Sequence, residues 1–371
     1  MARTTPAAVS YEDKRTVVQE MPIPAPSADH GLLKVELTGV CGSDWPYYQK
    51  YPKSKGPLIL GHEVVGVVTE MGAEAAARLG FREGDRVAIE EYIPCGHCRY
   101  CRSGDFRLCD ETDTLNYPDT VRYGSTPGSR APALWGGYSQ YLHLTPNAVL
   151  HKVPDKVPAL LATLALPLGN GVEWAYLQGG VKFGETVVIQ GPGQQGLACC
   201  VAAKAAGAGC VIVTGRSSSM DQRRLALART LGADHTITID QQDLVATVTD
   251  ITGGQMADLV IDCASGGTET VVSAIALARK AGRIILGGRK FKRVPDFDSD
   301  VLISRFLTVK GMRGHSFESV EIALQIIASG RWPLESLCTH VFGLDEVDEA
   351  LRTVGGEGRP DPIHCAVDPW R

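Results

Sequence analysis

Four cysteines lie close together in the segment PCGHCRYCRSGDFRLC, and their spacing is that of a metal site. Cys95, Cys98, Cys101 and Cys109 are separated by two, two and seven residues. Zn²⁺ in a structural site prefers four thiolates in a closed tetrahedron, and CxxC pairs present two sulfurs to one ion without strain. The spacing therefore predicts a structural zinc in a lobe at 94–110. Four protein ligands leave no open position for a substrate, so the reactive chemistry should lie elsewhere.

Two other short stretches carry reactive side chains. GVCGSDWPYY supplies Cys41, Ser43 and Asp44, and LILGHEVVGVV supplies His62 and Glu63 some twenty residues later. Either stretch alone is a weak signal, because a single cysteine or histidine is more often buried or satisfied by hydrogen bonds.

A glycine-rich turn in TVVIQGPGQQGLACC indicates a dinucleotide site. Gly191, Gly193 and Gly196 follow a predicted strand and open a predicted helix, with Gln194 and Gln195 inside the turn. Glycines allow a tight turn and a close approach of the pyrophosphate, and the helix N-terminus offers unpaired N–H groups to it.

The next predicted strand, CVIVTGRSSS, bears on which dinucleotide binds. An NAD site usually ends this strand with an acid for the ribose 2′-hydroxyl, and Gly215 takes that position here. Arg216 and Ser217 follow, with Arg224 further on, and arginine with hydroxyls supplies charge-assisted donors for a 2′-phosphate. The pattern predicts a preference for NADP(H) over NAD(H). In the alternative interpretation, Arg216 lies across the adenine or in solvent and the enzyme uses NAD.

The elements that must position these residues fall into two patterns. From about Leu32 to Leu150, short β-rich runs punctuated by Gly, Pro and Asp predict a barrel-like β domain. After HKVPDKVP, short apolar strands alternate with helical stretches, which predicts an α/β fold with a doubly wound parallel sheet. Two surface helices are expected after FLTVKGMRG, and the segment 116–137, rich in turn formers, is expected to be a long surface loop.

Length and composition set the broad class. A chain of 371 residues is long enough for two domains, because a single core rarely grows beyond roughly 250–300 residues. The apolar share of 44% and the net charge of −5 are those of an ordinary globular protein and do not indicate nucleic-acid binding. The first residues lack the apolar core of a signal peptide, and no stretch is long enough to span a membrane, so a cytoplasmic location is expected.

Taken in order, the motifs resemble the zinc-dependent medium-chain dehydrogenase/reductase family of alcohol, polyol and threonine dehydrogenases. The resemblance runs through CGSD, GHEVVGVV, GDRV, the cysteine lobe, GGYSQY, PLGNGV, the glycine-rich turn and LGAD, and covers nearly the whole chain. It implies a GroES-like catalytic domain at 1–160, a Rossmann domain at 161–312 and a return to the catalytic domain at 313–371. It also implies a small-molecule alcohol or carbonyl substrate and a homodimer or homotetramer.

The resemblance also assigns roles to individual residues. Cys41 and His62 would be catalytic zinc ligands, Glu63 a neighbouring acid or exchanging ligand, Ser43 the relay for the alcohol proton, and Tyr47 part of the substrate pocket. Such an open zinc site polarises an alcohol or carbonyl oxygen so that hydride can pass to the cofactor. By position beyond the strand ends, two further loops are expected to line the ribose and nicotinamide pocket, through Cys263, Ala264, Leu286, Gly287 and Gly288.

One departure from the family pattern affects the metal. Members of the polyol and threonine branch carry a glutamate before the PLGN-like turn as third zinc ligand, and Leu166 occupies that place here. Glu63 could become a direct ligand, Asp44 or another group could substitute, or the site could hold zinc weakly or not at all. We favour the first account, because it keeps three protein ligands and a water. The rival functions are a zinc-free NADPH-dependent reductase of activated C=C bonds on the same fold and a non-catalytic cofactor-binding protein.

Overall fold

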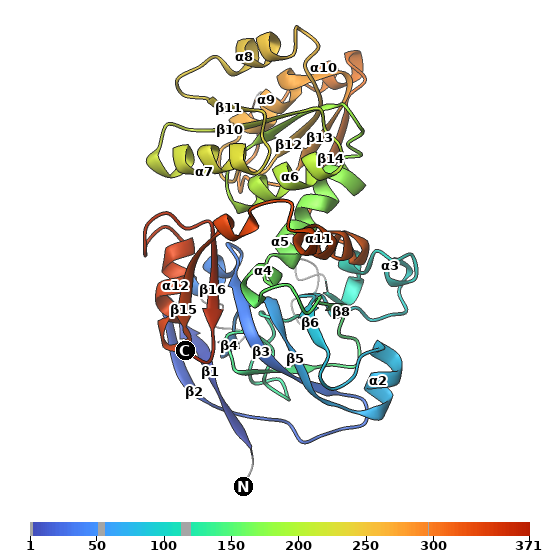
Figure 1. Ribbon diagram of the computed structural model, residues 1–371, viewed down its shortest axis with the longest axis vertical. Helices are drawn as coiled ribbons and strands as arrows, with labels where there is room; N and C mark the ends of the chain where they lie inside the picture. The colour runs from blue at the N-terminus through green and yellow to red at the C-terminus, as the bar shows by residue number, and fades with distance from the viewer. Residues whose placement is uncertain (1–2, 51–55, 113–119, 296) are drawn as a thin grey trace. The chain divides into compact units, whose positions relative to one another are not determined.

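The computed structural model describes residues 3–50, 56–112, 120–295 and 297–371, and the chain forms two compact units (Figure 1). The first unit comprises Met1–Leu166 and Leu337–Arg371, and the second comprises Pro167–Ser336. The first unit is therefore built from both ends of the chain. No helix among the described residues is long and apolar enough to cross a membrane.

The first unit is β-rich. Its larger sheet has the order β15-β16-β3-β5-β6-β8, with β7 also paired to β3, and a smaller sheet has the order β2-β1-β4. The strands are β1 (Thr4–Glu12), β2 (Arg15–Pro22), β3 (Gly31–Val40), β4 (Leu58–Ile59), β5 (Glu63–Met71), β6 (Arg86–Ile89), β7 (Tyr141–Leu144), β8 (Leu150–Lys152), β15 (Cys338–Gly343) and β16 (His364–Asp368). The helices are α1 (Asp44–Gln49), α2 (Ala73–Leu79), α3 (Arg99–Arg102), α4 (Ala159–Ala162) and α12 (Val347–Val354). Helix α5 (Ala165–Val172) contains the boundary between the units.

The ladder between β3 and β5 matters most for the site. These strands are antiparallel, and Gly39 near the end of β3 lies opposite Glu63 at the start of β5. Both valines of β3 and three of the four valines of β5 are buried, so the hydrophobic core holds this register. Strand β16 pairs with the other edge of β3, which brings the last residues of the chain to the same place.

The second unit contains a six-stranded parallel sheet with the order β11-β10-β9-β12-β13-β14. Its strands are β9 (Thr186–Gln190), β10 (Cys210–Gly215), β11 (His235–Thr238), β12 (Ala257–Asp262), β13 (Ala278–Leu286) and β14 (Thr308–Gly311). The helices are α6 (Gln194–Ala205), α7 (Ser219–Thr230), α8 (Leu244–Ile251), α9 (Glu269–Leu277), α10 (Ser299–Ser304) and α11 (Phe317–Ser329), with a π-helical turn at Glu173–Leu177. Numbered from β9, this is the order 3-2-1-4-5-6 of a doubly wound dinucleotide-binding fold, as predicted.

The expectation of a surface loop at 116–137 is wrong for its described part, 120–137. Tyr123, Leu134 and Trp135 are buried, and Thr126 is buried with its hydroxyl bonded to the Arg122 carbonyl. Turn-forming residues explain the irregular backbone, but the large side chains between them fill the core. Residues 116–119 of this segment lie outside the described residues.

Candidate functional site

Three side chains of types that can bind a metal ion converge in the first unit. Cys41 follows β3, Glu63 begins β5, and His62 immediately precedes it, so the β3–β5 ladder brings the two motifs together. One ligand atom from each lies within 4.8 Å of the other two. The set of one thiolate, one imidazole and one carboxylate suits Zn²⁺ with a fourth position open.

Asp44 holds the histidine of this group in position. This carboxylate is 2% exposed, and its Oδ1 lies 3.1 Å from His62 Nδ1. Its Oδ2 accepts hydrogen bonds from the Tyr138 hydroxyl at 2.9 Å and from the Cys41 N–H at 3.3 Å. Burial lowers the pKa of His62, but the charge and hydrogen bond of Asp44 outweigh it and hold that pKa well above its usual value. Because Asp44 takes the Nδ1 side of the ring, Nε2 is the nitrogen left for a metal.

Glu63 is a buried acid that lacks a full set of partners. Its side chain lies in the core, and Oε2 has no hydrogen-bond partner among the described residues. Burial raises the pKa of Glu63 to about 7, an effect that Asp44 increases and His62 opposes. A buried carboxylate oxygen without a donor is costly, and a cation bound beside it removes that cost. The residues present therefore fit a metal ion. Leu166 is buried and offers no ligand.

The two other residues expected to act here lie on or beside α1. The exposed Ser43 has its hydroxyl 3.2 Å from Cys41 Sγ and 3.3 Å from His62 Nε2. Tyr47 is half-buried and packs against an apolar cluster of the same unit. Burial and the charge of Glu63 raise the pKa of the Cys41 thiol, and His62 opposes this shift.

Sequence reasoning missed three residues around this group: Tyr138, Thr163 and His364. His364 Nδ1 lies 4.0 Å from Glu63 Oε2, and its Nε2 lies 2.7 Å from the Thr163 hydroxyl. Burial lowers the pKa of His364 to about 4. These residues stand 75, 100 and 301 positions from Glu63 in the chain, and no local motif links them to it.

The predicted zinc lobe is a separate cluster. The sulfurs of Cys98 and Cys101 are 3.6 Å apart and those of Cys95 and Cys101 are 3.9 Å apart. A zinc–sulfur bond of about 2.3 Å in a tetrahedron places its sulfurs about 3.8 Å apart, so these separations suit one ion. The Cys101 N–H donates to Cys98 Sγ and lowers the pKa of that thiol to about 6, while burial raises that of Cys109.

The predicted cofactor turn has the required form. Gly191 adopts φ +98°, and Gly193 caps helix α6. A Cβ on Gly196 would lie 1.9 Å from the Gly191 carbonyl oxygen, whereas a Cβ on Gly193 would meet nothing within 4 Å. Gly196 is thus needed for the backbone to pack, and Gly193 leaves open space before the helix N-terminus. Gln194 and Gln195 form its first turn.

At the end of β10, the predicted residues lie in a loop organised by acids. Gly215 ends the strand, and Arg216 and Ser217 are exposed. The backbone N–H of Arg216 donates to the Asp221 carboxylate. The backbone N–H and the hydroxyl of Ser217 donate to the Asp240 carboxylate. Arg224 lies further on, in α7.

The loops after β12 and β13 are joined. The backbone N–H groups of Gly287 and Gly288 both donate to the Asp262 carbonyl oxygen, and Leu286 precedes them at the end of β13. Lys290, which sequence reasoning missed, reaches the Ala264 carbonyl and pairs with the buried Asp262 carboxylate at 2.7 Å. Cys263 Sγ lies 3.7 Å from Cys199 Sγ in α6.

Comparison with known proteins identifies the family. Residues 27–155 match the alcohol dehydrogenase GroES-like domain, and residues 196–329 match the zinc-binding dehydrogenase domain. A Mycobacterium tuberculosis protein named a probable alcohol dehydrogenase is 36% identical over 98% of each chain. The chain belongs to the zinc-type alcohol dehydrogenase family. A sorbitol dehydrogenase of Halalkalibacterium halodurans is 32% identical to this dehydrogenase, over 91% of this chain and 92% of the relative.

Solved structures agree with the fold of this dehydrogenase. The crystal structure of an alcohol dehydrogenase from Thermotoga maritima superposes with a TM-score of 0.86, covering 99% of both chains at 26% identity. The GroES-like domain and the Rossmann-type parallel sheet expected from the sequence are thereby confirmed.

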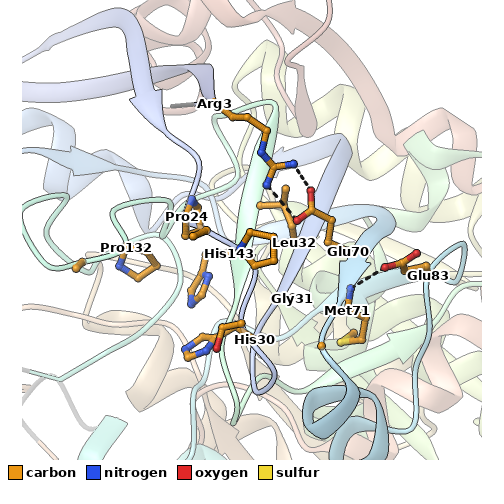
Figure 2. Close-up of a pocket in the computed structure, with 15 residues that line it drawn as sticks. Arg3, Pro24, His30, Gly31, Leu32, Glu70, Met71, Glu83, Pro132 and His143 are labelled. Atoms are coloured by element: carbon orange, nitrogen blue, oxygen red, sulfur yellow. Dashed lines mark hydrogen bonds and ion pairs between the residues drawn. The ribbon is translucent and has the colours of Figure 1, made fainter. Parts of the chain in front are cut away.

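The dehydrogenase also has a cavity of about 580 Å³ that is separate from the candidate metal and cofactor residues (Figure 2). It is lined by Arg3, which precedes β1, by the start of β3 and by the end of β5. His30 and His143, whose rings are 4.7 Å apart, also line it. An ion pair between Arg3 and Glu70 crosses one side of it. None of the predicted site residues contributes to its lining.

Proposed function

We propose that this dehydrogenase interconverts an alcohol and its aldehyde or ketone at a zinc ion held by Cys41, His62 and Glu63, with a nicotinamide cofactor as hydride acceptor or donor. The observation that carries the proposal is the convergence of the three ligand groups, one of them a buried carboxylate with an unpartnered oxygen. Glu63 thus serves in place of the ligand that Leu166 cannot supply.

Each residue has a defined task in this reaction. A bound zinc supplies a Lewis acid for the substrate oxygen. Asp44 fixes the ring of His62 through Nδ1, which keeps Nε2 directed at the ligand group. Ser43 is exposed to solvent, and its hydroxyl lies within hydrogen-bonding distance of Cys41 Sγ and His62 Nε2. This hydroxyl is therefore suited to pass the alcohol proton from the site to solvent. We further propose that Tyr47 contacts the substrate.

The cofactor proposal rests on the turn after β9 and the loop after β10. Gly191, Gly193 and Gly196 and the N-terminus of α6 suit a pyrophosphate. The absence of an acidic side chain at Gly215 and the exposed Arg216 favour NADP(H) over NAD(H). We propose that Cys263, Ala264 and 286–288 line the remainder of the cofactor.

Cofactor preference is tested with Arg216→Ala and a matched exposed arginine on α7, Arg229→Ala. The ratio of kcat/KM for NADP⁺ to that for NAD⁺ should fall at least tenfold in Arg216→Ala, because a 2′-phosphate loses its cation. It should stay unchanged in Arg229→Ala. A wild-type enzyme that prefers NAD⁺, with no change in Arg216→Ala, would refute the preference.

Substrate oxidation is tested by offering an allylic secondary alcohol with NADP⁺ and, separately, an α,β-unsaturated ketone with NADPH. The proposal predicts oxidation of the alcohol and reduction of the ketone C=O, both lost in Cys41→Ser. Reduction of the C=C bond instead, unaffected by Cys41→Ser, would establish the zinc-free reductase. Tight NADPH binding without turnover of any alcohol or carbonyl would indicate the non-catalytic alternative.

We also propose a homodimer or homotetramer in the cytoplasm. The edge strand β14 is exposed along all four residues, which leaves its backbone available for pairing with another copy. Light scattering coupled to size-exclusion chromatography gives the oligomeric state, and a monomer at micromolar concentration would exclude this assembly.

A further inference from the structure

The cysteine lobe carries two further side chains of metal-ligand type beside one of its cysteines. His97 lies two residues after Cys95, and Glu111 lies two residues after Cys109. The backbone N–H of Cys95 donates to Cys109 Sγ at 3.3 Å, so the two turns lie side by side. One ligand atom from each of Cys95, His97 and Glu111 lies within 4.8 Å of the other two. A second group of possible ligands therefore adjoins the four cysteines and has Cys95 in common with them.

The hydrogen bond of His97 to the backbone determines which of its nitrogens can bind a metal. Its Nδ1 lies 3.0 Å from the Cys95 carbonyl oxygen, which can only accept, so Nδ1 carries a hydrogen. In a neutral ring Nε2 is then the bare nitrogen, and it lies 3.5 Å from Glu111 Oε1. Zinc bonds of about 2.1 Å to nitrogen and to oxygen, at the tetrahedral angle, place those two atoms about 3.4 Å apart. The observed separation therefore suits one ion.

We propose that Cys95, His97 and Glu111 form a second, exchangeable zinc position on the lobe, with the Cys95 thiolate shared between this ion and the one predicted among the four cysteines. The sulfur of a zinc-bound thiolate keeps lone pairs that can bind a second ion. Three protein ligands leave a fourth position for water. The side chains of His97 and Glu111 are 70% and 64% exposed, so solvent reaches the position and the ion can leave again. The inference depends on zinc in the lobe and goes beyond the function proposed at Cys41.

The test counts the zinc bound by Cys41→Ser, which is expected to lack the ion proposed at that residue. The protein first passes through gel filtration without added metal and is then titrated with Zn²⁺ in equilibrium dialysis. In the same background, His97→Gln removes the imidazole and Glu111→Gln replaces the carboxylate by an uncharged amide. His235→Gln is the matched control, because it removes an exposed histidine of β11 in the second unit. A parallel titration with Co²⁺ reports the ligand type, because a cobalt–thiolate bond gives a charge-transfer absorption that nitrogen and oxygen ligands do not.

We expect one zinc ion per chain before the titration and one further, saturable ion during it. The further ion should bind at least tenfold more weakly in His97→Gln and in Glu111→Gln and with unchanged affinity in His235→Gln. Co²⁺ in its place should show the thiolate absorption while the first zinc ion is retained.

Unchanged affinity in His97→Gln or in Glu111→Gln, or bound Co²⁺ without thiolate absorption, would mean an adventitious ion only and would overturn the inference. These results leave the zinc proposed at Cys41 untouched, because that ion is tested separately by comparing the wild type with Cys41→Ser.

Discussion

Replacing Asp44 by asparagine tests how His62, the histidine that we propose to bind zinc, is oriented. The carboxylate accepts from His62 Nδ1 at 3.1 Å, from the Tyr138 hydroxyl at 2.9 Å and from the Cys41 N–H at 3.3 Å. Asparagine keeps the shape but has one acceptor oxygen and one donor nitrogen. In one orientation the amide N–H group of asparagine faces the Nδ1–H of His62, so two donors meet. In the other orientation it faces the Tyr138 hydroxyl and the Cys41 N–H, which donate to Asp44 in the wild type.

The expected loss can be worked from these contacts. Removing the partner that orients a metal-binding histidine lowers metal affinity about 10- to 100-fold. That factor corresponds to about 1.4–2.7 kcal/mol. The same substitution removes the charge that raises the pKa of His62, so this pKa should fall.

The assay is chelator competition for the proposed second zinc ion, which the Cys41→Ser variant is expected to lack. Tyr138→Phe is the matched control, since it removes one bond to Asp44 without touching His62, and its affinity should stay within about threefold of the wild type. Wild-type zinc affinity in Asp44→Asn would refute the reasoning, because the carboxylate would then have no part in orienting the ring.

Four further predictions concern other parts of the structure. Gly196→Ala should lower the free energy of unfolding by about 1–3 kcal/mol in urea, because its Cβ would lie 1.9 Å from a backbone carbonyl oxygen. Gly193→Ala, with nothing within 4 Å, should fold normally but bind the cofactor at least tenfold more weakly in a fluorescence titration, and unchanged binding would contradict a pyrophosphate site there. Lys290→Met should cost about 3 kcal/mol of stability by leaving a buried carboxylate without its cation, and wild-type stability would contradict that pairing. Burial lowers the pKa of His143 to about 3. Below pH 6.5 the unfolded chain therefore binds a proton at this histidine while the folded chain does not, and the free energy of unfolding falls as pH falls. His143→Phe removes this loss, so its stability relative to the wild type should rise by about 2 kcal/mol between pH 7 and pH 5, and a constant difference would argue against the shift.

Local spacing explains what could be predicted from the sequence. The CxxC pairs of the zinc lobe and the strand–turn–helix of the cofactor site each lie within about 25 consecutive residues, so chain geometry alone constrains them. The alternation of short strands and helices likewise predicted the parallel sheet. The convergence of Cys41 and Glu63 was expected only by resemblance to a family, because it depends on the register of β3 against β5.

Contacts between distant segments could not be predicted. His364 and Thr163 meet 201 positions apart, through the pairing of β16 with β3 and the place of α4. The segment at 120–137 was misread for a related reason. Its turn formers are a local signal, whereas burial of Tyr123 and Trp135 depends on the strands around them and leaves no periodic pattern.

The account rests on a metal at Cys41 in a chain that has Leu166 where the family resemblance leads us to expect a third ligand. The measurement that tests it most directly is the zinc content per chain, by elemental mass spectrometry, of the wild type and of Cys41→Ser. The account predicts two zinc ions in the wild type and one in the variant. One zinc ion in both proteins would confine the metal to the cysteine lobe and contradict zinc-assisted alcohol oxidation.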